Sequence, residues 1–256
     1  MRAQTLPAMA GWRWLVEGFA IYRRNPALLL LIVFSYWIAL ILVNLVPILG
    51  PVVATVAMPA FAVGVMNACR ELDEGRLPPP GTLLSGFRTE LRTLLILGVI
   101  YLVLTIGILF LSALLDDGAM MRFLMSGKAP SNSSPGAGAI LAPLIATCLL
   151  IPLLMAYWFA PMLAAWHRLT PPKALFFSLV ACWINWRAFM IYGLALLVLA
   201  AVLPAFILLL GAIVAPGAVG ALGTIVSVPL LVVLMPVVFA SFYASYRGIF
   251  RLSEQA

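Results

Sequence analysis

Six long apolar runs without a single Asp, Glu, Lys or Arg dominate this chain of 256 residues. A helix of about 20 apolar residues crosses the roughly 30 Å hydrocarbon core of a bilayer, and helical structure satisfies the backbone polar groups that lipid cannot. The chain is 65% hydrophobic and 9% charged, whereas soluble domains are about a quarter charged. These features predict an all-α integral membrane protein, a single polytopic domain over residues 1–256. The expected transmembrane helices are 27–47, 51–69, 93–115, 138–166, 188–210 and 219–246.

The fourth and sixth runs are longer than a bilayer requires. We therefore expect residues 138–166 and 219–246 to tilt, kink or project beyond the hydrocarbon.

The positive charges lie almost entirely on one side of the predicted membrane. Of the 15 Lys and Arg residues, all but Arg122 and Lys128 fall in segments that six spans place on the same side. Such segments stay in the cytoplasm. The sequence therefore predicts cytoplasmic N- and C-termini. The net charge of +7 is a topology signal of this kind and does not indicate nucleic-acid binding.

Three similar sequence repeats cover most of the chain, at roughly 8–72, 82–169 and 173–250. In each, a short amphipathic segment precedes an outward span and a return span, which predicts three hairpins, each introduced by an interfacial helix at the cytoplasmic face. The second repeat contains an outer loop at 116–137. The apolar stripes of the three segments are Trp12, Leu15, Val16 and Phe19; Leu84, Phe87 and Leu91; and Phe176, Leu179, Val180 and Trp183.

Four short stretches carry a resemblance to known proteins: Gly11–Trp14, Tyr22–Pro26, Cys182–Phe189 and Tyr192–Gly193. They resemble an uncharacterised family of proteobacterial six-helix inner-membrane proteins. More loosely, the repeated pattern is similar to the membrane domain of some glycerophosphodiester phosphodiesterases. The resemblance implies the bacterial inner membrane and no catalytic residue.

Arginines at the ends of the return spans are the first candidates for binding. Arg70, Arg168 and Arg247 each lie where a return helix is expected to leave the membrane, at the level of lipid phosphates. Further candidates for lipid-phosphate contacts come from the predicted surface segments and the residues beside them: Arg13, Arg88, Arg92 and Arg187. The expected partners are membrane lipids, including anionic headgroups at the cytoplasmic face. The sequence names no protein partner.

An acidic cluster follows the first return span. Glu71, Asp73 and Glu74 alternate with Arg70 and Arg76 ahead of three prolines at 78–80. This pattern predicts a solvated loop with local ion pairing and a stiff stop.

Three functions compete. The first, which we favour, is a non-enzymatic protein that organises lipids or a partner protein, because the spans lack intramembrane charges and no catalytic, cofactor-binding or metal-ligating motif is found. The second is a transporter or lipid carrier that uses proline-kinked return helices. Its prolines are Pro59, Pro143, Pro152, Pro161, Pro229 and Pro236. The third is an enzyme acting on lipid headgroups, with Arg70, Arg168 and Arg247 as its phosphate binders.

Overall fold

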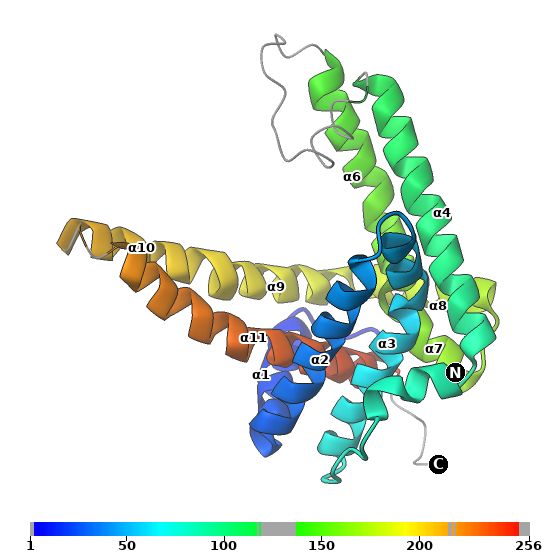
Figure 1. Cartoon of the computed structure of the whole chain (residues 1–256), viewed down its shortest axis with the longest axis horizontal. Helices are drawn as coiled ribbons and strands as arrows, with labels where there is room; N and C mark the ends of the chain where they lie inside the picture. Colours follow the sequence, from blue (N-terminus) through cyan, green and yellow to red (C-terminus); the bar gives the residue numbers. More distant parts are fainter. Residues whose placement is uncertain (1–2, 117, 119–136, 215–216, 218, 251–256) are drawn as a thin grey trace. The chain divides into compact units, whose positions relative to one another are not determined.

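The computed structural model describes residues 3–116, 118, 137–214, 217 and 219–250, and in this part of the chain the regular structure is helical (Figure 1). Among these described residues, six helices are long and apolar enough to cross a membrane, as predicted. Their ends lie within a few residues of the expected ones. The predicted outer loop at 116–137 falls almost wholly outside the described residues. The spanning segments are Pro26–Asn44, Leu49–Asp73, Leu91–Leu115, Leu141–His167, Trp186–Ile213 and Leu222–Ile249.

The chain divides into two compact units, and each is described by itself. One contains the chain up to Leu42, Phe61–Thr89 and the chain from Ala181 onward; the other contains Val43–Ala60 and Glu90–Val180. The elements, in chain order, are α1 (Ala10–Arg24), α2 (Pro26–Asn44), α3 (Leu49–Asp73), η1 (Thr82–Arg88), α4 (Leu91–Leu115), α6 (Ala137–Trp158), α7 (Ala160–His167), α8 (Pro171–Ile184), α9 (Trp186–Leu197), η2 (Val198–Val202), α10 (Leu203–Val214) and α11 (Val219–Ile249).

In the first unit, α1 packs closely on both α9 and α11. Two glycines make this approach possible. A Cβ on Gly11 would clash with the Ala188 carbonyl oxygen of α9, and a Cβ on Gly18 would lie 2.5 Å from the Ser241 backbone nitrogen of α11. The hydroxyls of Tyr192 and Ser241, 2.8 Å apart, join α9 to α11. The face of α1 that carries the two glycines is therefore its protein-facing side.

The predicted stripes of the first and third surface segments mostly face away from the protein. On α1, Leu15 is buried, but Trp12, Val16 and Phe19 are 44%, 51% and 43% exposed. The same division holds on α8, where Phe176 and Trp183 are exposed while the small residues of the opposite face are buried. Small side chains allow helices to approach closely, which leaves the bulky apolar side chains for the surroundings, as in an interfacial helix.

The second surface segment is not an α-helix. Residues 82–88 form the 3₁₀-helix η1, and Leu91, expected on its stripe, already belongs to α4. Gly81 (φ +82°) precedes η1 and Glu90 (φ +49°) follows it, so left-handed residues bound it on both sides. The stripe prediction is wrong here because it continued one periodicity through two breaks.

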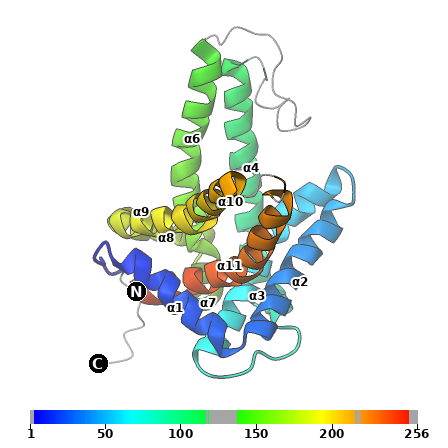
Figure 2. The ribbon, with the colours of Figure 1, turned by 90° about the vertical axis from the view of Figure 1, so that its left-hand side faces the viewer.

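In the second unit, α4 and α6 run side by side (Figure 2). The Tyr157 hydroxyl of α6 donates to the Leu97 carbonyl oxygen of α4 at 2.9 Å, and the rings of Tyr101 and Tyr157 meet with centroids 5.0 Å apart. A Cβ on Gly98 would clash with the Val56 carbonyl oxygen, so α3 also approaches α4 closely.

The long fourth run is broken, as expected, between α6 and α7. Pro161 lacks an N–H and its ring crowds the carbonyl of Tyr157, four residues earlier. The buried Ser178 hydroxyl from α8 bridges the break, since it accepts from the Phe159 N–H (2.9 Å) and donates to the Met155 carbonyl (2.8 Å). A second irregularity is the π-helical η2, which ends two residues before Pro204. The sixth run, by contrast, stays one helix, with Pro229 and Pro236 inside α11.

Ser178→Ala is expected to destabilise the protein by about 1–3 kcal/mol, because it leaves the Phe159 N–H without its partner inside the packed break. Thr147→Ala is the matched control, since that exposed hydroxyl donates to the Pro143 carbonyl of its own helix and bridges no break. Thermal unfolding in detergent measures both variants. Equal losses of stability in the two variants would show that the Ser178 bridge does not stabilise the break.

Candidate lipid-phosphate site

A polar pocket of about 410 Å³ lies in the first unit, at the C-terminal end of α3. The last turns of α3, the following loop and η1 supply its walls. Its polar side chains are Asn67, Arg70, Glu71, Arg76, Thr82, Ser85 and Arg88. It therefore gathers three guanidinium groups at the end of a spanning helix.

Local geometry holds η1 against α3. Gly64 lets the η1 backbone approach closely, because a Cβ there would clash with the Leu83 carbonyl oxygen. The Asn67 amide donates to the Ser85 hydroxyl at 2.7 Å, and the Thr82 hydroxyl donates to the Pro79 carbonyl at 2.6 Å. The proline stop predicted at 78–80 therefore leads directly into one wall of the pocket.

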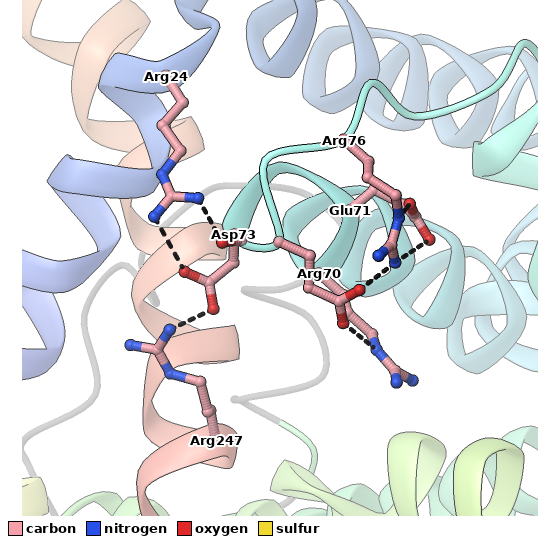
Figure 3. Close-up of polar contacts among 7 residues, drawn as sticks. Arg24, Arg70, Glu71, Asp73, Arg76 and Arg247 are labelled. Carbon is pink, nitrogen blue, oxygen red and sulfur yellow. Dashed lines mark hydrogen bonds and ion pairs between the residues drawn. The ribbon is translucent and has the colours of Figure 1, made fainter.

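Two carboxylates partly neutralise the pocket (Figure 3). Arg70 pairs with Glu74 at 3.0 Å, and Arg76 pairs with Glu71 at 2.7 Å and also with Glu74. The local ion pairing predicted for this cluster is confirmed for Glu71 and Glu74. The predicted loop is wrong up to Asp73, because α3 extends to that residue. Within the described part of the chain, Arg88 has no ion pair, so its charge is available to a ligand.

The ion pairs also affect the titration of Glu74. The hydrogen bond from Arg70, followed by that from Arg76, lowers the pKa of Glu74. A group with a depressed folded-state pKa stabilises the fold above its unfolded pKa, and this contribution fades as the pH falls through the folded value. Because Glu74 is largely exposed, solvent screening keeps that contribution small. Glu74 therefore stays charged at neutral pH and holds Arg70 and Arg76 in place.

A second ion-pair cluster joins three helices of the same unit. Asp73, whose side chain is 12% exposed, pairs with Arg24 of α1 and with Arg247 of α11 (Figure 3). Arg247 also donates to Glu17 of α1 at 2.7 Å, and Arg24 donates to the Leu72 carbonyl at 2.9 Å. Arg247 thus connects α1, α3 and α11 through its carboxylate partners.

The structure distributes the predicted arginines over different settings. Arg70 and Arg88 line the pocket, and Arg247 belongs to the Asp73 cluster. Arg168 lies in the second unit, 84% exposed, with Glu90 3.6 Å away. The remaining three are exposed: Arg13, Arg92 and Arg187, the last with its guanidinium 5.5 Å from the Trp186 ring centroid.

Sequence reasoning did not select four of the hydrogen-bond donors of the pocket: Arg76, Asn67, Thr82 and Ser85. Arg76 was assigned only to local ion pairing. The available signal was the run of prolines and Gly81, which turns the chain back toward α3. With these residues the pocket offers guanidinium, amide and hydroxyl donors, which suit the oxygens of a phosphate group.

One curated protein resembles this chain along nearly its whole length. It is described as a "Probable inner membrane protein" of Burkholderia thailandensis and is 38% identical over 266 residues, covering 99% of this chain and 96% of the relative. No family model matches the chain, and no solved structure matches it. These comparisons support the resemblance to inner-membrane proteins and give no link to glycerophosphodiester phosphodiesterases.

Proposed function

This chain belongs to the family of the Burkholderia inner-membrane protein, and from that premise we propose that it is a non-enzymatic organiser of anionic lipids in the inner membrane. The observation that carries the proposal is the pocket at the end of α3, where Arg70, Arg76 and Arg88 converge. Guanidinium groups bind phosphate with short, charge-assisted hydrogen bonds, frequently two at once.

The position of the pocket suits lipid headgroups. It lies at the last turns of a helix long enough to span the membrane, hence near the level of the phosphates. The charge distribution predicts that this end of α3 faces the cytoplasm, where anionic lipids attract basic residues by about 1 kcal/mol for each Lys or Arg. We therefore propose that the cytoplasmic leaflet supplies the ligand.

The balance of charges in the pocket predicts that it binds a lipid phosphate with modest affinity. Glu71 and Glu74 occupy part of the donor capacity of Arg70 and Arg76, so a lipid phosphate competes with carboxylates already in place. Arg88 has no such competitor in the described part of the chain and would contribute most of the gain. An exchangeable lipid, rather than a permanently held one, follows from this balance.

Arg88→Gln is expected to weaken binding of phosphatidylglycerol about tenfold relative to phosphatidylcholine, since a hydrogen bond to a charged group contributes roughly 1.5–3 kcal/mol. Lipid occupancy of the full chain in nanodiscs of defined composition measures this. Arg92→Gln is the matched control, because it removes the same charge four residues further on, outside the pocket. Equal losses in the two variants would reduce the effect to general attraction and refute a pocket.

A lipid carrier is the second candidate, favoured by the break between α6 and α7 and by the π-helical η2. Irregular helices of this kind expose backbone groups along transport pathways. Reconstitution into vesicles distinguishes the two: an organiser leaves the rate of lipid movement between leaflets unchanged, whereas a carrier accelerates it.

A further inference from the structure

An apolar groove of about 280 Å³ lies in the first unit between α1, η2 and α11. The α1 side consists of Trp12, Leu15, Val16 and Phe19. On the other side, Leu199 comes from η2, and Leu234 and Val237 come from α11. Every side chain that lines it is apolar. Of the four on α1, Leu15 is buried, and the other three are left exposed by the packing of α1 on the protein.

The groove reaches into the depth of the membrane. Leu199 and Leu234 belong to helices of membrane-spanning length. At 1.5 Å per residue, Leu234 lies about 20 Å along α11 from Arg247, which marks the charged end of that helix. A water-soluble ligand would not reach this depth, whereas the acyl chains of lipids fill this part of a bilayer.

A cation stands on the same face of α1. The Arg23 guanidinium lies 5.9 Å from the centroid of the Phe19 ring, one helical turn earlier. Positions 12, 16, 19 and 23 follow the helical period, so Arg23 continues the row of exposed apolar side chains. In the part of the chain that the structure describes, Arg23 forms no ion pair. One end of the apolar face therefore carries an available positive charge.

We propose that the groove holds one acyl chain of an anionic phospholipid, with the lipid phosphate at Arg23. The groove is too small for a helix, which is about 10–12 Å across with its side chains. The apolar walls suit a hydrocarbon chain and Arg23 suits a phosphate, so the two parts of one phospholipid match the two parts of the site. The groove and the basic pocket share no residue, so either proposal can fail without the other.

Filling the groove tests the proposal. In Leu234→Trp the larger side chain takes the place of the acyl chain, and we expect about tenfold less phospholipid to remain on the full chain after mild detergent extraction, as counted by native mass spectrometry. Leu231→Trp is the matched control, because Leu231 is 57% exposed on the same helix and does not line the groove. Arg23→Gln should keep the phospholipid but lose its preference for phosphatidylglycerol over phosphatidylcholine.

Unchanged retention in Leu234→Trp, or equal loss in Leu231→Trp, would overturn the proposal. If Leu234→Trp yields no folded protein, Val16→Trp fills the groove from the exposed face of α1 and is judged by the same two outcomes. Arg88→Gln, which tests the basic pocket, should leave retention in the groove unchanged.

Discussion

Replacing Gly18 by alanine is expected to lower the free energy of unfolding by about 2 kcal/mol, within the roughly 1–3 kcal/mol typical of overpacked sites. The added Cβ would lie 2.5 Å from the Ser241 backbone nitrogen and 2.7 Å from its Cα, so two helix backbones would have to separate. No rotamer change relieves this contact, because the obstacle is main chain. Thermal unfolding in detergent, followed by circular dichroism, measures the loss.

The control for Gly18→Ala has the opposite expected sign. Gly193 lies on α9, in the same unit, and a Cβ there meets nothing within 4 Å. Gly193→Ala should therefore stabilise the helix by about 0.5–1 kcal/mol through lower backbone entropy of the unfolded chain. If both substitutions were stabilising, the close approach of α1 and α11 would be contradicted.

Asp73→Ala is expected to cost about 2 kcal/mol, because one carboxylate holds arginines from two other helices. Removing one partner of a fully buried pair costs roughly 3–5 kcal/mol. Here the side chains of Arg24 and Arg247 are 48% and 42% exposed, so water compensates for part of the loss. Chemical or thermal unfolding at low salt measures the effect.

Glu74→Gln is the comparison for Asp73→Ala. Its carboxylate lies one residue further on but is more exposed and pairs with arginines of its own segment. A change below about 0.5 kcal/mol is expected. A similar cost for both variants would mean that Asp73 does not connect the helices.

The membrane-spanning helices could be predicted because a helix that crosses lipid needs about 20 consecutive apolar residues, and the uncharged runs meet this requirement. The break at Phe159 was also foreseeable, since Pro161 follows it in a run too long for the bilayer. The helical periodicity of the surface segments could not show whether their apolar side chains face the protein or its surroundings. Trp12 and Phe19 form an apolar stripe, but in a membrane protein an apolar stripe can face lipid as well as a core.

The pocket could be predicted only in part, for a different reason. Arg70 stood out at the end of its helix, whereas Arg76 and Thr82 reach the pocket through a loop whose path depends on Gly81 and on the close contact at Gly64. Such contacts follow from tertiary packing, which local sequence patterns do not encode. Arg88 was a candidate, but the sequence could not show that it forms no ion pair with any of the described residues.

The contacts of α1 have a consequence for synthesis. Glu17 and Arg247 are 230 positions apart in the chain, and the Leu6 N–H donates to the Asn185 side-chain oxygen at 2.8 Å. At about 5–20 residues per second, a ribosome needs roughly 10–45 s to make the residues between α1 and the end of α11. Throughout that interval the buried face of α1 has no α11 to cover it. Helix α1 can therefore dock on α11 only after the last membrane-spanning helix has been made.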